Sequence, residues 1–334
     1  ALNGCFTATT EGFSSFKRSF RGLKAWKKLA RVEQKAPALQ SQRPGAGLFN
    51  VGNSCYINVI LQCLTYTPPL ANYLLSSKHS QACQHQGFCM MCTMEAHVRK
   101  FFLFVFPSSS GRQGSAYEFL RCTVSAMHRA CLSGSSDLGV SSQQTTIVDQ
   151  IFGGFMKYTG HSQITSLSIL IFLPAFLDVS FDIRVTSGCV RQEKGCVAFL
   201  GKSGAFQHLA VCLVSRCKKK AAASENATVH RAPRVLTLCL ERADQQNGAK
   251  ISKFVEYPEY LDLRPYMSDT AGEPLLYSLC AIMVHSGDTC LEGHFLCYTK
   301  ASNGLWYKMD DDYVENCDIH TVLGQQAYLL FYTR

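Results

Sequence analysis

The spacing of apolar residues changes from a helical period in the first half of the chain to a strand period in the last third. After Ser54, apolar residues recur every three or four positions, and the pair Pro68-Pro69 is expected to stop this helix. A second helix is predicted over 118–132, where the same spacing returns. The apolar positions of the two helices are Ile57, Ile60, Leu61 and Leu64, then Phe119, Leu120, Val124, Met127 and Cys131.

The last third of the chain contains β-branched and aromatic runs that predict strands. Asn303-Gly304 lies between two of these runs and predicts a hairpin. Helices followed by an antiparallel sheet define an α+β fold, in which the cleft between the two halves is a natural position for an active site. The predicted strands are 235–240, 276–284, 295–299, 305–309 and 328–332.

The composition is that of a globular protein with a sizeable core, since 47% of the 334 residues are hydrophobic and 17% are charged. The longest apolar stretch, 164–177, is interrupted by polar residues and Pro174, so we expect buried core there and no membrane span. The 17 cysteines are an odd number, and several lie inside apolar runs, which favours a reducing compartment over a disulfide framework.

Basic residues are concentrated at the N-terminal end. Residues 1–35 carry eight Lys or Arg against two Glu, which places +6 of the net charge of +9 in this segment. The region 1–43 is interpreted as a flexible basic leader, or as a basic amphipathic helix that meets nucleic acid, an acidic partner or a nuclear import receptor. The helical alternative rests on the spacing of Phe16, Phe20, Leu23, Trp26 and Ala30.

Cys55 lies where the first predicted helix begins, at the end of Gly47-Leu-Phe-Asn-Val-Gly-Asn-Ser-Cys55. The partial positive charge of a helix N-terminus lowers the pKa of a thiol and so favours the nucleophilic thiolate. Asn50 could direct an amide N–H at an oxyanion. A cysteine at a helix start is also a common structural residue, so a catalytic role requires a base and a partner for that base.

His294 follows a glycine-rich loop at the head of a predicted strand, where a neutral imidazole could accept the thiol proton and later protonate a departing amine. Asp310 lies 16 positions later on the next strand of the hairpin, where its carboxylate could hold the imidazole in the required tautomer. Asp311 is the alternative for that role. A core histidine and a solvated acidic turn are the structural alternatives for each motif taken separately.

Together, the Cys, His and Asp motifs resemble the ubiquitin-specific protease family of papain-like cysteine peptidases. The resemblance implies a thumb, palm and fingers architecture over 44–334, with the thumb over about 44–150 and the fingers and palm over about 151–334. It also implies isopeptide hydrolysis through an acyl-enzyme at Cys55, without a catalytic cofactor. The matching segments are Gln62–Tyr73, Gly87–Met94, Arg264–Ser268 and Lys300–Tyr307.

Three segments depart from the family pattern. Ser115 replaces an aspartate that would hold the tail of ubiquitin. In the fingers, 156–177 contains no cysteine, so the two Cys-x-x-Cys pairs that hold a zinc in relatives are incomplete. Residues 241–243 read Glu-Arg-Ala in place of Lys-Arg-Phe. These departures leave open a catalytically weak or inactive ubiquitin-binding pseudoenzyme.

A separate group of residues has the ligand types and close spacing of a structural zinc site: His79, Cys83, Cys89 and Cys92. The alternative is three ordinary thiols and a solvated histidine. The expected partners are ubiquitin and ubiquitinated proteins, with no membrane, and with nucleic acid only through the basic leader. The expected location is the nucleus, with the cytoplasm as the alternative.

Overall fold

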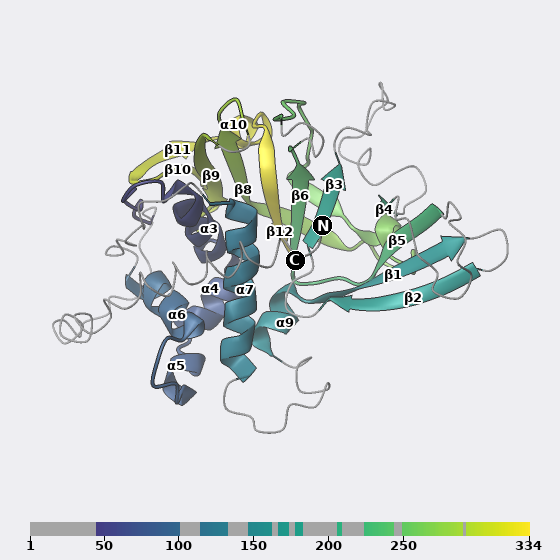
Figure 1. The fold of residues 1–334 in the computed structure, drawn as a ribbon, viewed down its shortest axis with the longest axis horizontal. Helices are drawn as coiled ribbons and strands as arrows, with labels where there is room; N and C mark the ends of the chain where they lie inside the picture. The colour runs from purple at the N-terminus through teal and green to yellow at the C-terminus, as the bar shows by residue number, and fades with distance from the viewer. Residues whose placement is uncertain are drawn as a thin grey trace.

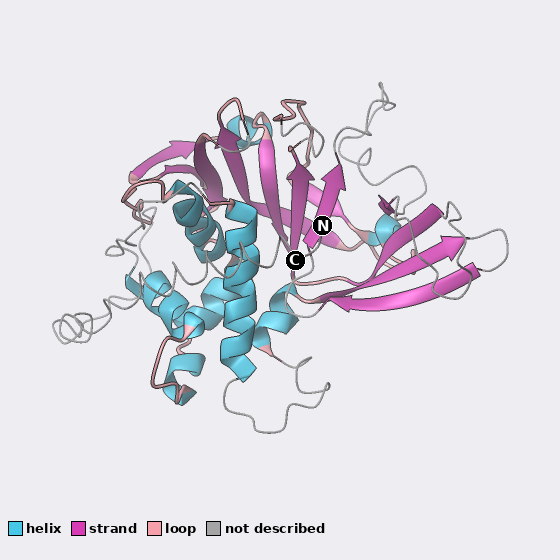
Figure 2. Ribbon diagram, in the orientation of Figure 1, coloured by secondary structure: helices cyan, strands magenta, loops and turns pink. Residues whose placement is uncertain are grey.

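The computed structural model describes residues 45–100, 114–132, 146–161, 166–173, 178–182, 206–208, 224–243, 249–289 and 292–334. Helices pack on one side of a large sheet, and a smaller sheet extends away from it (Figure 1). Figure 2 shows the same division, with the helices on the left and the strands above and to the right. The predicted α+β class is confirmed. The basic leader over 1–43 lies outside the described residues, as do Cys212 and Cys217, which are what remains of the later cysteine pair expected in the fingers.

The helical half is built mainly from the N-terminal part of the described chain. The first predicted helix is confirmed as α3, which ends at Thr65. The helix ends before the proline pair, as expected, and the same prolines open α4, because proline fits the first turn of a helix, where its missing N–H has no acceptor to lose. The second predicted helix is confirmed as α7, which begins two residues before the predicted start. The helices are α3 (Cys55–Thr65), α4 (Pro68–Leu75), α5 (Lys78–Ala82), α6 (Met90–Lys100), α7 (Ala116–Leu132), α9 (Ile147–Phe152) and α10 (Ile319–Leu323).

The large sheet has eight strands in the order β11-β10-β9-β8-β12-β6-β3, with β7 paired to β8. All five predicted strands are present, and Asn303-Gly304 lies in the hairpin between β9 and β10. The sheet is antiparallel except where β3 pairs with β6 in parallel. Its strands are β3 (Asp178–Asp182), β6 (Val235–Glu241), β7 (Tyr260–Asp262), β8 (Leu276–Ser286), β9 (His294–Lys300), β10 (Trp306–Asp310), β11 (Tyr313–Cys317) and β12 (Ala327–Thr333).

The smaller sheet has the order β2-β1-β5-β4 and extends to the right in Figure 1. The described part of the apolar stretch, 166–173, forms its edge strand β2 and not a helix. Within the described residues, no helix is both long and apolar enough to cross a bilayer. The strands are β1 (Gly154–His161), β2 (Ser166–Leu173), β4 (Phe206–His208) and β5 (Ser224–Arg231).

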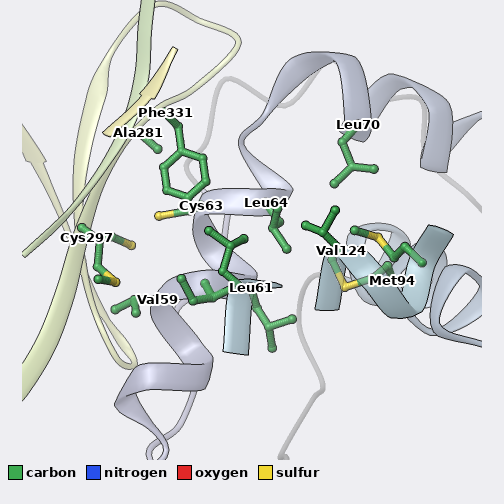
Figure 3. Close-up of a cluster of buried hydrophobic side chains, with 14 of the residues drawn as sticks. Val59, Leu61, Cys63, Leu64, Leu70, Met94, Val124, Ala281, Cys297 and Phe331 are labelled. Atoms are coloured by element: carbon green, nitrogen blue, oxygen red, sulfur yellow. The ribbon is translucent and has the colours of Figure 1, made fainter. Parts of the chain in front are cut away.

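Helix α3 lies in the middle of the main core (Figure 3). One face of α3 turns Cys63 toward Phe331 and Cys297 of the large sheet, and another meets α4, α6 and α7 through Leu70, Met94 and Val124. Each fully buried aliphatic side chain contributes roughly 1.5–3 kcal/mol. The start of α3 is therefore held firmly against the head of β9.

Candidate active site

The loop before α3 turns through two consecutive residues with left-handed backbone, Gly52 (φ 98°) and Asn53 (φ 52°). Glycine and asparagine are the residues that adopt this conformation at least cost. The side chain of Asn50 stabilises the turn, since its Oδ1 accepts from the N–H groups of Gly52 at 3.0 Å and Ser54 at 3.1 Å. The loop thus delivers Cys55 as the first residue of the helix.

Asp311 joins this loop to the turn after β10. Its carboxylate accepts from Asn50 Nδ2 at 2.9 Å and from Asn58 Nδ2 at 2.8 Å, while its carbonyl accepts from Leu48 N at 2.7 Å. Asn58 was not identified from the sequence as a site residue. It lies three positions after Cys55, which puts both on the same helical face, and that spacing is the signal that could have found it.

His294 and Asp310 lie side by side across the β9–β10 hairpin. Imidazole Nε2 is 2.6 Å from Asp310 Oδ1 and 4.0 Å from Asp311 Oδ2, so the geometry favours Asp310 as the partner of the imidazole. Lys308 Nζ lies 3.2 Å from Asp310 Oδ2. Burial raises the pKa of the Asp310 carboxyl, but the hydrogen bonds from His294 and Lys308 outweigh this effect and hold the pKa below its ordinary value.

Cys55 is only 3% exposed, and burial raises the pKa of its thiol above the ordinary value. A hydrogen bond from the backbone of Phe295 lowers that pKa, the charge of Asp311 raises it, and the N–H groups of Tyr56 and Cys55 itself lower it. The expectation that the helix start lowers the pKa is therefore wrong in its net direction, because desolvation is the largest effect. Since Phe295 directly follows His294, the hydrogen bond also brings the thiol to the head of β9.

A raised thiol pKa predicts the pH dependence of Cys55 alkylation in the resting protein. Iodoacetamide reacts with the thiolate, whose fraction grows about tenfold per pH unit below the pKa. We expect the rate at Cys55, followed by mass spectrometry of its peptide, to rise through pH 8 without a plateau. A rate already constant between pH 6 and 8 would show a preformed thiolate and contradict the raised pKa.

The four candidate metal ligands meet at one place beside α5 and α6. One ligand atom from each of His79, Cys83, Cys89 and Cys92 lies within 4.8 Å of all the others. His79 Nε2 is 3.1 Å from Cys89 Sγ. A tetrahedral zinc with Zn–S bonds of about 2.3 Å separates its sulfur ligands by about 3.8 Å, so small side-chain rotations would close the site.

The protonation states of this cluster fit a cation. Burial lowers the pKa of His79, which keeps its imidazole neutral and able to coordinate. Burial is the largest effect and raises the pKa of both Cys89 and Cys92, and the neighbouring thiols raise that of Cys92 further. Such thiols ionise together only when a positive charge lies between them. Glu95 accepts a 2.6 Å hydrogen bond from Ser80, and its charge raises the pKa of His79 without outweighing the effect of burial.

Ser115 lies at the start of α7 and is exposed. Its hydroxyl is 3.4 Å from the N–H of Glu118, and its carbonyl accepts from Phe119 N at 3.0 Å. This is the hydrogen bonding of a helix N-cap, which serine and aspartate both provide. The replacement of aspartate by serine is therefore compatible with the local backbone.

The chain belongs to the ubiquitin carboxyl-terminal hydrolase family, whose model matches residues 46–332. It is 45% identical over 315 residues to ubiquitin carboxyl-terminal hydrolase 42 of Homo sapiens, covering 88% of this chain and 23% of that protein. It is 44% identical over 313 residues to the human ubiquitin carboxyl-terminal hydrolase 17-like protein 6, covering 88% of this chain and 76% of that relative. For 17-like protein 11, also human and 44% identical, the chain covers 57% of the relative.

The solved structures agree with the thumb, palm and fingers architecture. The SAGA DUB module of Ubp8, Sgf11, Sus1 and Sgf73 bound to monoubiquitin matches with a TM-score of 0.73 at 24% identity, covering 93% of this chain and 74% of that chain. The yeast SAGA DUB module with an altered Sgf73 matches with a TM-score of 0.71 at 25% identity, covering 93% and 73%. The papain-like fold expected from the sequence is thereby confirmed.

Proposed function

We propose that this chain is a deubiquitinating cysteine protease that hydrolyses peptide and isopeptide bonds at the C-terminal glycine of ubiquitin. The proposal is supported by the family membership and by the ubiquitin in the matched SAGA structure. The single observation that carries it is the placement of the Cys55 thiol against Phe295, next to a histidine whose Nε2 is 2.6 Å from Asp310. The proposed partners are ubiquitin and ubiquitinated proteins.

The proposed mechanism begins with proton transfer from the thiol to the imidazole. In the tautomer with its proton on Nε2, His294 donates to Asp310, and Nδ1 carries the lone pair that accepts the proton of Cys55. Because the thiol pKa is raised, this transfer accompanies the attack instead of preceding it. Sulfur then bonds to the glycine carbonyl carbon, the imidazolium protonates the departing amine, and water releases ubiquitin from the thioester.

Asn50 is the proposed oxyanion donor. A side-chain amide has two N–H bonds, of which Asp311 takes one and the other can point toward the carbonyl oxygen of the substrate. In this proposal, Asp310 orients the base while Asp311 orients Asn50. Hydrolysis of a fluorogenic ubiquitin C-terminal conjugate tests the proposed function, and absence of turnover by the pure protein contradicts it.

We also propose that His79, Cys83, Cys89 and Cys92 hold a structural zinc. All four positions of a tetrahedral site are filled by protein, which leaves none for substrate or water. The ion would join the segment around α5 to the start of α6. A zinc in the fingers is not proposed, because the cysteine pairs are incomplete in the sequence.

Ser115 supports a second candidate, a weak or inactive ubiquitin-binding pseudoenzyme. A carboxylate at this helix start would accept N–H groups of the ubiquitin tail in charge-assisted bonds worth roughly 1.5–3 kcal/mol, which serine does not provide. We therefore expect Ser115→Asp to raise kcat/KM for the fluorogenic conjugate by up to about ten- to a hundredfold. Ser115→Asn is the matched control, because asparagine caps a helix but carries no charge. An unchanged kcat/KM in Ser115→Asp would show that serine at this position does not limit binding of the ubiquitin tail. Any loss of activity would then arise elsewhere in the cleft.

The nucleus is the proposed location, and the cytoplasm is the alternative. The support is the excess of basic residues in 1–35, which is the composition that import receptors and nucleic acids recognise. Deletion of this segment from a fluorescent fusion tests the proposal, since the fusion should then lose nuclear accumulation. Salt-dependent binding of RNA by the full chain would instead support a nucleic-acid role for the leader.

A further inference from the structure

Lys250 lies on a segment that a buried arginine fixes to the large sheet. Arg242 is 2% exposed, and its Nη1 donates to the carbonyls of Ile251 at 3.0 Å and Lys253 at 2.7 Å. Its Nε donates to the carbonyl of Ala327 in β12 at 2.7 Å. The N–H of Ile251 donates back to Arg242 O at 2.7 Å. Lys250 therefore projects from a firmly anchored backbone.

The ammonium group of Lys250 reaches the loop that leads to the proposed catalytic base. Lys250 Nζ donates to His285 O at 2.8 Å and to Gly287 O at 2.6 Å. Both carbonyls belong to the end of β8 and the residues just after it, and β8 pairs with β9 through Ser286 and His294. One charged group thus fixes the two backbone positions that flank Ser286, the strand partner of His294.

The described parts of this loop pack on one another so closely that neither of its two glycines has room for a side chain. A Cβ on Gly287, which has φ 147°, would lie 2.7 Å from Glu292 O. A Cβ on Gly293, which has φ 153°, would lie 2.6 Å from the Nε2 atom of His285. Because both glycines adopt conformations that other residues rarely reach, the backbone path into His294 is narrowly defined. A Cβ on Gly287 would also meet Gly293, the residue before His294. A displacement of Gly287 therefore also displaces Gly293.

The ring of His285, whose carbonyl accepts from Lys250, contacts the residue that follows His294. It packs against Phe295 with ring centroids 4.5 Å apart. Burial and, after it, the electrostatic interactions with Lys250 and His294 lower the pKa of His285 to about 4, so the ring is neutral at physiological pH. The ammonium that acts on this ring is the one that donates to the carbonyls of His285 and Gly287.

We propose that Lys250 is a positioning residue that holds the carbonyls of His285 and Gly287, so that His294 faces Cys55. This inference rests on the proposed function and adds to it a residue outside the triad. A charge-assisted hydrogen bond from an ammonium is stronger than a neutral one, and two such bonds from one anchored side chain restrict the loop in two directions. Loss of the ammonium leaves both carbonyls without this donor.

The test compares Lys250→Met, Lys250→Arg and the matched control Lys253→Met, whose target is an exposed lysine on the same segment. Hydrolysis of the fluorogenic ubiquitin conjugate by the full chain gives kcat and KM, and hydrogen exchange follows the amides of 285–289. Lys250→Met is expected to lower kcat by about ten- to a hundredfold with little change in KM, because misplacement of a catalytic group affects the chemical step. Exchange should accelerate in 285–289. Lys250→Arg should recover most of kcat, since a guanidinium also offers several donors.

Wild-type kcat in Lys250→Met would overturn the inference, as would exchange that accelerates throughout the large sheet and so reports general destabilisation. If the wild-type protein hydrolyses no conjugate, the proposed function fails. The exchange comparison then still decides whether Lys250 holds the loop, because it requires no turnover.

Discussion

Replacement of Cys55 by serine is expected to abolish hydrolysis of a ubiquitin C-terminal conjugate. A hydroxyl has no anionic form near neutral pH, and the imidazole of His294 can remove the proton of a thiol far more readily than that of an alcohol. The loss of kcat should reach roughly 10⁴-fold or more, as is found when a catalytic nucleophile is removed. Initial rates at saturating conjugate provide the measurement.

The matched control is Cys63→Ser, because Cys63 is a buried thiol on the same helix that faces the core and not the loop before α3. This control tests whether removal of a thiol from α3 lowers activity only because it lowers the stability of the protein. We expect the control to keep measurable turnover at a temperature where it remains folded. Turnover unchanged in Cys55→Ser would contradict the cysteine-protease mechanism.

Removal of the zinc ligands is expected to have the second largest effect, on stability instead of chemistry. The purified protein should contain about one zinc per chain, and Cys89→Ser combined with Cys92→Ser should remove it. The expected cost is several kcal/mol, since structural zinc binding contributes directly to folding. Elemental analysis measures the metal, and thermal unfolding measures the stability.

Cys122→Ser combined with Cys317→Ser is the control for this prediction, because both are half-buried free thiols outside the cluster. This pair should keep the zinc and unfold at nearly the wild-type temperature. A wild-type protein without zinc, or a zinc that survives the loss of Cys89 and Cys92, would refute the site.

The sequence predicts the central elements of the fold because their signals are local. The apolar spacing around Ile60 predicts α3, and Asn303-Gly304 predicts the β9–β10 hairpin, which brings His294 and Asp310 within 2.6 Å. The short helices α4 and α5 lack such signals. Pro68 marks the end of one helix in the sequence, but that it also opens the next depends on the packing of Leu70 and Leu74 in the core.

Two features of the site depend on contacts between distant parts of the chain. Burial is the largest effect on the pKa of Cys55, and Phe295 and Asp311, which also act on it, lie more than 200 positions away, so a rule about helix starts gives the wrong net direction. The bridge from Asn50 to Asn58 passes through Asp311, which is 261 positions from Asn50. Sequence spacing does not reveal such a contact. The ligands of the candidate zinc site, in contrast, lie within 14 positions and could be found from spacing.

The most direct measurement of the central claim is covalent labelling by ubiquitin that carries a C-terminal electrophile. The reaction requires both seating of the ubiquitin tail and a nucleophile at the position of the scissile bond. The account predicts one adduct per chain, mapped by peptide mass spectrometry to Cys55, and its loss in Cys55→Ser. Absence of an adduct, or an adduct on another cysteine, would contradict the account.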